Sequence, residues 1–255
     1  MKTACVTNVG GKNTNQDSLL VVQADTSTGP VLLAMVCDGM GGLQKGELAS
    51  AVVIRAFDHW FQTDFPIMVG RGFTPEELFG EWNRLIQESN RDLILCGKKY
   101  GIQIGTTVSG IMIFRNQYYI INVGDSRVYE ITDAGIRCLT KDHSLVMREV
   151  EQGRLSPEEM EHDRRRNVLL QCIGATGEVK PDFFLGDASP RKVYMICCDG
   201  FRHEISAKEF YEILCPGKQP DQKALQGHLQ QLIDMNIQRG ERDNITAIGI
   251  IADGQ

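Results

Sequence analysis

Residues 31–37 are the feature that most constrains the fold of this chain. Seven consecutive apolar residues end directly in Asp38, and glycine occupies positions 39, 41 and 42. An apolar run of this length is typical of a strand that is buried on both faces. Glycine allows the backbone to bend and lets another atom approach it closely. We therefore expect Asp38 at the end of a core strand, where its carboxylate and the carbonyl of Gly39 could bind a hard divalent cation.

Three further acids occupy a similar position in the sequence. Asp125 follows an apolar run, Asp199 ends another, and Asp243 directly precedes the last one. Because an acid next to glycine after a strand is also a common turn, no single motif establishes a metal site. If the strand ends meet, two carboxylates 4 Å apart repel by about 4 kcal/mol at an effective dielectric near 20, unless protons or cations neutralise them. Oxygen ligands favour Mg²⁺ or Mn²⁺ over Zn²⁺, and a two-ion site of this kind suits phosphoryl transfer.

The spacing of apolar residues predicts a chain of mixed strands and helices. Alternation with a period of two predicts strands, and apolar residues three to four apart predict helices. Short turns join the segments between residues 106 and 131, which indicates antiparallel pairing in a meander. We therefore expect an α+β fold with helices on antiparallel sheets, organised as one domain over residues 1–255. The predicted strands are residues 3–9, 19–22, 31–37, 106–114, 118–123, 127–131, 193–198 and 245–251; the predicted helices are 49–60, 74–93 and 225–233, with a connector at 66–72, a short helix after Ser206 and a polar helical excursion at 140–175.

The composition argues against several classes of protein. The net charge of −6 disfavours a nucleic-acid partner, and the sequence contains no run of 18 apolar residues that would predict a membrane span. The eight cysteines show no metal-finger spacing, and Cys37, Cys197 and Cys198 lie inside apolar runs. Free thiols in a reducing compartment are therefore expected, which predicts a cytoplasmic protein.

The acids fall within seven short motifs, and together these motifs resemble a known family. The motifs are Asn15-Gln16-Asp17, Asp38-Gly39-Met40-Gly41-Gly42, Gly105-Thr106-Thr107, Val123-Gly124-Asp125-Ser126-Arg127, Leu139-Thr140-Lys141-Asp142-His143, Cys198-Asp199-Gly200 and Asp243-Asn244-Ile245-Thr246. Each motif alone is a weak signal, but seven in order with plausible separations are specific. In this order and over nearly the whole chain, they resemble the metal-dependent protein phosphatases of type 2C.

The resemblance implies a fold and a set of metal ligands. The fold would be an α-β-β-α sandwich, in which helices flank two antiparallel sheets and the metals lie at one end. Asp38 would bridge two Mn²⁺ or Mg²⁺ ions, and the carbonyl of Gly39 would bind the second ion. Asp199 and Asp243 would bind the first ion, which makes these three acids the implied catalytic residues. Asp125 resembles the residue that, with Asp199, holds a third ion in bacterial members.

The resemblance also implies a phosphate-binding residue and an outer metal shell, and it is not complete. Lys12 stands where the family usually has a phosphate-binding Arg, so it keeps the charge but loses the bidentate fork. Gln16, Asp17 and Asn244 would form the outer shell, with Gln16 in place of the usual Glu. Met40 replaces the His of animal members that is proposed as general acid. Bacterial members often have Met there, so the chain resembles the bacterial type, and its proton donor is unassigned.

The implied activity is hydrolysis of phosphoserine and phosphothreonine in proteins. A metal-bridging hydroxide would attack the phosphorus, and no covalent phosphoenzyme would form. Expected partners are phosphoproteins, including a counterpart serine/threonine kinase, and the expected state is a monomer. Residues 140–175 would form a flap beside the cleft that discriminates between substrates. Two alternatives remain: a catalytically degenerate binding module, suggested by Lys12 and Gln16, and a metal-dependent phosphatase of small molecules.

Two features near these motifs allow more than one interpretation. His143 could assist proton transfer, but a loop His beside Asp142 is more often structural. The basic run at residues 164–166 could contact a substrate, but such runs usually form a solvated face.

Overall fold

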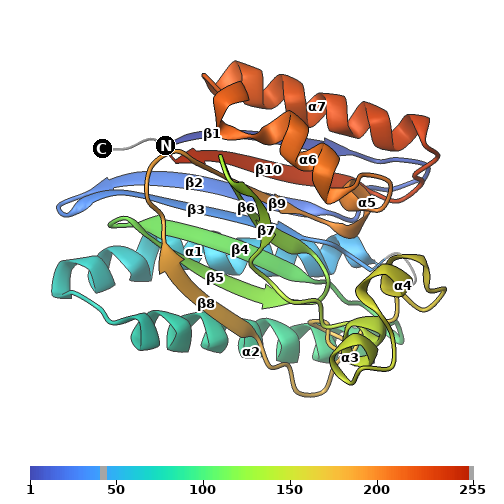
Figure 1. Cartoon of the computed structure of the whole chain (residues 1–255). Helices are drawn as coiled ribbons and strands as arrows, with labels where there is room; N and C mark the ends of the chain where they lie inside the picture. Colours follow the sequence, from blue (N-terminus) through green and yellow to red (C-terminus); the bar gives the residue numbers. More distant parts are fainter. Residues whose placement is uncertain (41–44, 253–255) are drawn as a thin grey trace.

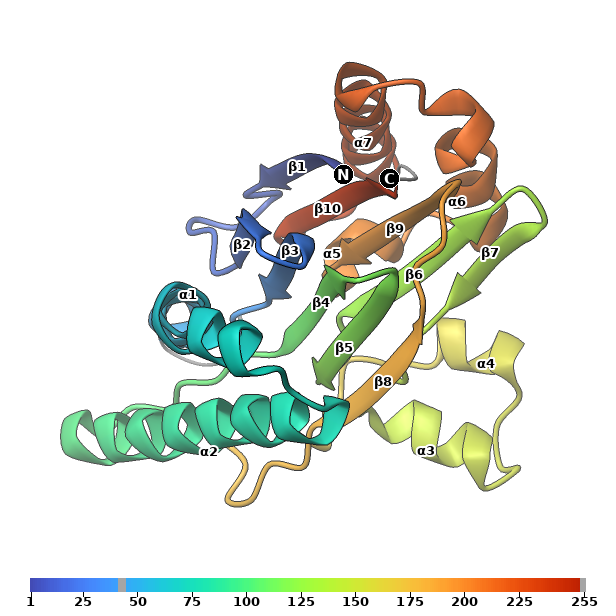
Figure 2. The same cartoon turned by 90° about the vertical axis from the view of Figure 1, so that its left-hand side faces the viewer.

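The computed structural model describes residues 1–40 and 45–252, so Gly41 and Gly42 of the glycine motif lie outside the described residues. Two five-stranded antiparallel sheets face each other in this structure. Helices α1 and α2 cover the outer face of one sheet, and α6 and α7 cover the other (Figures 1 and 2). The predicted α-β-β-α sandwich is therefore confirmed.

The strand order is β1-β10-β9-β6-β7 in one sheet and β2-β3-β4-β5-β8 in the other. The strands are β1 (Lys2–Asn8), β2 (Ser18–Thr26), β3 (Gly29–Cys37), β4 (Val108–Phe114), β5 (Gln117–Val123), β6 (Arg127–Thr132), β7 (Gly135–Cys138), β8 (Asp182–Asp187), β9 (Lys192–Cys197) and β10 (Ile245–Ala252). The helices are α1 (Gly46–Arg71), α2 (Pro75–Tyr100), α3 (Leu145–Glu151), α4 (Pro157–His162), α5 (Asp199–Arg202), α6 (Ala207–Leu214), the short 3₁₀ helix η1 (Pro216–Lys218) and α7 (Gln222–Gln238).

Strand β3 is buried on both faces, as its apolar sequence predicts. Alternate side chains point to opposite sides of the sheet. Leu32 and Val36 pack in the core between the two sheets, whereas Leu33 and Met35 pack in a second core beneath α1 and α2. Burial of each such side chain contributes about 1.5–3 kcal/mol. Both cores therefore fix β3 in place, and Asp38 emerges at its end.

Helix α2 begins as predicted, but α1 is longer than expected. The side chain of Thr74 caps α2 and forms a reciprocal capping box with Glu77. The predicted connector at residues 66–72 is wrong, because α1 continues through Pro66 to Arg71. Proline removes one helical hydrogen bond. The burial of Phe65, Met68 and Val69 against the aromatic core compensates for this loss.

The predicted meander is confirmed for β4 and β5 but is wrong for β6. Arg115 and Asn116, both with positive φ, form the tight turn between β4 and β5. Gly124, with φ 105°, then turns the chain so that β6 joins the opposite sheet. A Cβ atom at this position would lie 2.6 Å from Cγ2 of Thr107. This crossing places Asp125 between the ends of the two sheets.

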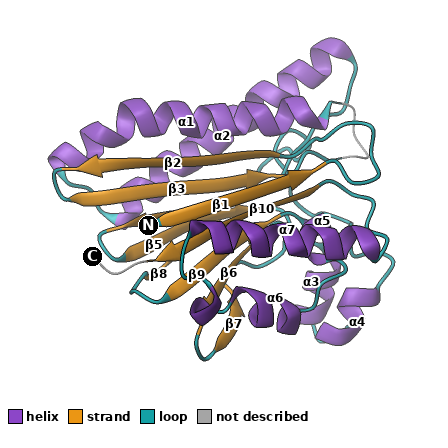
Figure 3. Cartoon of the chain, turned by 90° about the horizontal axis from the view of Figure 1, so that it is seen from above, coloured by secondary structure: helices purple, strands orange, loops and turns teal. Residues whose placement is uncertain are grey.

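Residues 140–175 leave the sheets and form α3 and α4, which contact each other (Figures 1 and 3). Isolated bridges join Ser144 to Leu169 and Thr106 to Ile173, and these tie the segment to the core. Its basic run includes Arg165, which pairs with Asp163 on the surface. Among the described residues, no helix is both long and apolar enough to cross a membrane.

Candidate metal centre and active site

Five carboxylates meet at one end of the sandwich. Asp17 precedes β2, Asp38 follows β3, and Asp199 begins α5 directly after β9. Asp125 lies in the crossing between the sheets, and Asp243 precedes β10. The pKa of Asp38 lies well above its usual value. Burial of the Asp38 carboxyl is the largest cause, and the negative charges of the other four acids add to it. The structure therefore brings together every acid that the sequence singled out.

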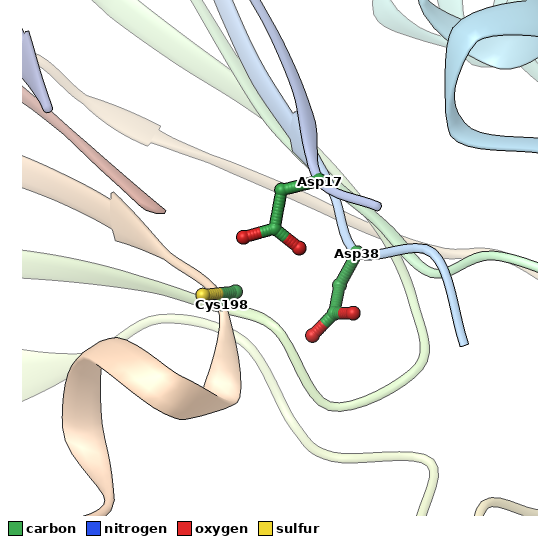
Figure 4. A group of neighbouring side chains, drawn as sticks. All are labelled: Asp17, Asp38 and Cys198. Carbon is green, nitrogen blue, oxygen red and sulfur yellow. The ribbon is translucent and has the colours of Figure 1, made fainter. Parts of the chain in front are cut away.

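Asp17, Asp38 and Cys198 form the closest group within this cluster. Carboxylate oxygens of the two acids and Sγ of Cys198 all lie within 4.8 Å of one another (Figure 4). Both oxygens of Asp17 are buried and accept no hydrogen bond of ordinary geometry, although the side chains of Thr246 and Cys198 lie close enough to act to lower its pKa. Burial raises the pKa of Asp17 to about 7, and the negative charges of Asp199 and Asp243 add to the effect. Asp17, predicted as part of an outer metal shell, therefore lies directly beside Asp38 in this cluster.

The backbone of Asp38 is held by the neighbouring Gly-Thr-Thr motif. The hydroxyl of Thr106 and the backbone N–H of Thr107 both donate to the carbonyl of Asp38 at 2.9 Å. The backbone N–H of Asp38 donates to Oγ1 of Thr107 at 3.1 Å. A Cβ atom at Gly39 would lie 2.4 Å from the carbonyl oxygen of Gln16, so the chain requires glycine there. These contacts fix the carboxylate of Asp38 at the strand end.

Asn244 organises the loop that carries Lys12, Gln16 and Asp17. Its Oδ1 accepts a hydrogen bond from the backbone N–H of Gln16 at 2.9 Å. Its Nδ2 donates to the carbonyls of Val9 and Thr14 at 2.9 and 3.2 Å. The side chain of Gln16 in turn donates to Glu47 at 3.3 Å. Asn244 therefore connects the start of β10 to the loop between β1 and β2.

His203 and Glu241 contact the centre, and the sequence did not single them out. Nε2 of His203 lies 3.5 Å from Oδ2 of Asp199, and its Nδ1 lies 3.1 Å from Oε2 of Glu241. Burial acts to raise the pKa of Glu241, but hydrogen bonds with His203 and with backbone N–H groups outweigh it and lower this pKa to about 2. The only signal in the sequence is the four-residue spacing of His203 from Asp199.

Arg202 was also missed, and it lies beside Asp125. Its Nη2 is 3.7 Å from Oδ2 of Asp125 and 3.6 Å from Oδ2 of Asp142. Arg127 forms a bidentate pair with Asp142, with both distances 2.7 Å. The position where a third ion would meet Asp125 therefore already has a guanidinium group next to it.

His143 has a structural role in the observed contacts. Its backbone N–H donates to the carbonyl of Gly124 at 2.8 Å, and its Nδ1 accepts from the backbone N–H of Gly124 at 3.3 Å. Its Nε2 lies 3.1 Å from Oδ2 of Asp182. These contacts hold the crossing that carries Asp125, which matches the structural interpretation of this histidine.

The donor atoms at this end of the sheets suit divalent cations. Buried polar atoms in folded proteins nearly always have a partner, yet both oxygens of Asp17 accept no hydrogen bond of ordinary geometry among the described residues. Burial and the charge of Asp199 raise the pKa of Asp125 to about 7, against the opposing charge of Arg202. Cations bound beside Asp17 and Asp38 would supply partners for the Asp17 oxygens and stabilise the ionised carboxylates. An oxygen-rich cluster of this kind at the end of an α-β-β-α sandwich suits a metal-dependent enzyme of phosphoryl transfer.

Comparison with known proteins identifies the family. Residues 8–255 match the family model described as protein phosphatase 2C. The serine/threonine phosphatase stp of Listeria monocytogenes is 31% identical over 219 residues, which cover 85% of this chain and 82% of the relative. The chain belongs to the protein phosphatase 2C family.

Solved structures agree with this assignment. Serine/threonine phosphatase Stp1 from Staphylococcus aureus has a TM-score of 0.86 and 25% identity, with coverage of 100% of this chain and 96% of that one. The catalytic domain of the phosphatase PstP, solved in complex with two manganese ions, has a TM-score of 0.78 and 24% identity. The match covers 97% of this chain and 96% of PstP, and at this identity it shows the shared fold.

Proposed function

We infer that this protein is a serine/threonine protein phosphatase that uses Mn²⁺ or Mg²⁺. The observation that carries this inference is the half-buried pair of Asp17 and Asp38. One carboxylate oxygen of each lies within 4.8 Å of the other, and the two oxygens of Asp17 are buried without a hydrogen bond of ordinary geometry. The family match and the similarity to the Listeria phosphatase support the substrate class. The two manganese ions of PstP support the metal requirement.

We propose that the two ions are held by the carboxylates of Asp38, Asp199 and Asp243 and by the carbonyl of Gly39. Asp38 would contact both ions, because the other carboxylates approach it from several elements. Two bound ions supply a water of lowered pKa and an electrostatic clamp for the phosphoryl oxygens. Lys12, at the exposed edge of the cluster, would bind the substrate phosphate.

The remaining residues of the cluster would orient these ligands. Gln16, Asp17 and Asn244 would bind metal-coordinated waters or hold the loop that carries Lys12. Asp125 was predicted as a ligand of a third ion, and its contact with Arg202 argues for a different role, described below. Substitution of residues that hold metal ligands in place typically lowers metal affinity by about 10–100-fold.

The proposed function also includes the domain organisation, the cellular location and the partners of the protein. We propose that residues 1–255 form one catalytic domain and that the flap at residues 140–175 contacts substrate proteins. The free cysteines support a reducing, cytoplasmic location. The proposed substrates are phosphoserine and phosphothreonine proteins, including a counterpart kinase, and the proposed state is a monomer.

The test is phosphate release from matched phosphoserine, phosphothreonine and phosphotyrosine peptides, with Mn²⁺ and with a chelator. We expect release from the first two peptides only, and its loss with the chelator. Asp38→Asn and Asp199→Asn should abolish release while the circular dichroism spectrum stays unchanged. Near-full activity of either folded variant would show that the metal assignment is wrong. Mn²⁺ binding without turnover would instead support a binding module.

A further inference from the structure

Arg202 lies where a third cation would have to approach Asp125. Its side chain and that of Asp125 are 15% and 8% exposed, so both are largely removed from water. The Nη2 atom of Arg202 also donates to the backbone carbonyl of Asp125 at 3.1 Å. Arg202 is thus fixed to the same turn that carries the acid.

Two arginines lie among the acids around Asp125. Arg202 contacts Asp125 and Asp142, and Arg127 is paired with Asp142. The negative charge of Asp199, which belongs to the metal cluster, also acts on Asp125. Burial acts to raise the pKa of Asp142, but the charges of Arg202 and Arg127 outweigh it and hold this pKa below the usual value. Arg127 is occupied by its bidentate pair, so Arg202 is the cation that faces Asp125. A divalent ion at Asp125 would therefore have to enter a largely buried position where a guanidinium already lies 3.7 Å from the carboxylate, and the two positive charges would repel each other.

The local sequence explains how one short helix supplies both groups. Asp199 begins α5 and Arg202 ends it, three residues later. Asp199 extends towards the metal cluster, where it contributes to the raised pKa of Asp38. Arg202 instead reaches the crossing at Asp125 and the base of the flap at Asp142. The same helix therefore places a metal ligand on one side and a fixed positive charge on the other.

We propose that Arg202 takes the place of a third metal ion in this enzyme. The guanidinium is the positive charge that contacts the carboxylate of Asp125, so Asp125 is a positioning residue and not a metal ligand, and the chain binds two ions. This inference rests on the proposed two-metal phosphatase function. It concerns the number of ions and the role of one acid, so it can be tested by counting metal.

The first experiment counts Mn²⁺ bound to the full chain by calorimetric titration and by electron paramagnetic resonance of the free ion. We expect two ions per chain in the wild type and two in Asp125→Asn, an isosteric change. A third ion in the wild type that is lost in Asp125→Asn would overturn the proposal. Absence of any bound Mn²⁺ would instead contradict the proposed function itself, so the two failures are distinguishable.

The second experiment removes the fixed charge. Arg202 lines a pocket of about 530 Å³ between the flap and α6, together with Asp142, Met160 and Phe210, so a shorter side chain leaves a space that solvent can reach. We expect Arg202→Ser to bind a third, weaker Mn²⁺ ion, and Arg202→Lys to bind two. The double variant Arg202→Ser with Asp125→Asn should also bind two.

A folded Arg202→Ser variant that binds only two ions would contradict the role of the guanidinium. Circular dichroism and thermal melting establish whether the variant is folded. If Arg202→Ser does not fold, the number of ions bound by Arg202→Lys decides the question. Three ions in Arg202→Lys would overturn the proposal, and two would support it. The wild-type and Asp125→Asn comparison does not depend on any change at Arg202.

Discussion

A Cβ atom at Gly200 would lie 2.2 Å from the backbone carbonyl oxygen of Asn244, so α5 and the start of β10 meet at a point that only glycine can occupy. We therefore expect Gly200→Ala to lower the free energy of unfolding by about 1–3 kcal/mol, the usual cost of overpacking. Because Asp199 and Asp243 adjoin this contact, Mn²⁺ affinity should fall as well. Denaturation in urea and calorimetric titration with Mn²⁺ measure the two effects.

Gly227 provides the matched control for this prediction. It lies inside α7, and a Cβ atom there would have no neighbour within 4 Å among the described atoms. Gly227→Ala should raise the free energy of unfolding by about 0.5–1 kcal/mol, since alanine favours the helix over glycine. Equal effects of the two substitutions would show that the close contact at Gly200 does not matter.

Lys12 provides a prediction about substrate binding. Its Nζ lies 3.1 Å from Oδ1 of Asp243, and both side chains are more than a third exposed, so breaking this pair should cost little stability. Lys12→Ala should raise the KM for a phosphothreonine peptide by about 10- to 150-fold, because a charge-assisted hydrogen bond contributes about 1.5–3 kcal/mol. Lys12→Arg should keep or lower KM through bidentate binding of phosphate. Steady-state kinetics at saturating Mn²⁺ measure both, and an unchanged KM in Lys12→Ala would remove this role.

The sequence predicted the parts of the fold that depend on local patterns. The apolar run before Asp38 and the capping boxes at Thr74 and Ser206 each follow from neighbouring residues, and the structure contains them. Strand β8 was not predicted, because it is an edge strand whose side chains are partly exposed and show no clear alternation. The transfer of β6 to the opposite sheet depends on the turn at Gly124. The spacing of apolar residues along the sequence does not predict this transfer.

The candidate site was predictable in its acids but not in their partners. Asp38 and Asp199 are marked by the strands they end. His203, Glu241 and Arg202 act through contacts that exist only once separate segments are packed together. Glu241 lies 38 residues from His203 in the sequence, and no spacing rule connects them.

Asp17 gives a prediction about pH in the metal-free protein. Its pKa in the folded chain is about 7, against a usual value of about 3.9 in an unfolded chain. The folded state therefore binds the Asp17 proton more tightly than the unfolded state does. This protonation stabilises the fold fully below about pH 4, and the stabilisation is lost as the pH rises to about 7. The free energy of unfolding changes by roughly 1.4 kcal/mol for each unit by which folding raises the pKa.

The measurement compares the wild type with Asp17→Asn by urea denaturation in a chelator between pH 5 and 7.5. The wild type should lose stability relative to the variant as the pH rises, because only the wild type ionises at this position. With saturating Mn²⁺ the order should reverse, since the variant lacks a charge that favours the ions. Parallel pH profiles in the chelator would show that Asp17 does not titrate in this range.

Glu241 gives a prediction about the orientation of a metal ligand. It holds His203 at 3.1 Å, and His203 in turn lies 3.5 Å from the carboxylate of Asp199. Glu241→Gln removes the charge that fixes this histidine, and we expect Mn²⁺ affinity to fall by about 10–100-fold with the fold retained. Glu204→Gln, the same change directly after His203, is the control and should leave the affinity within about twofold. Calorimetric titration with Mn²⁺ measures both variants, and equal affinities would show that the chain from Glu241 through His203 does not position Asp199.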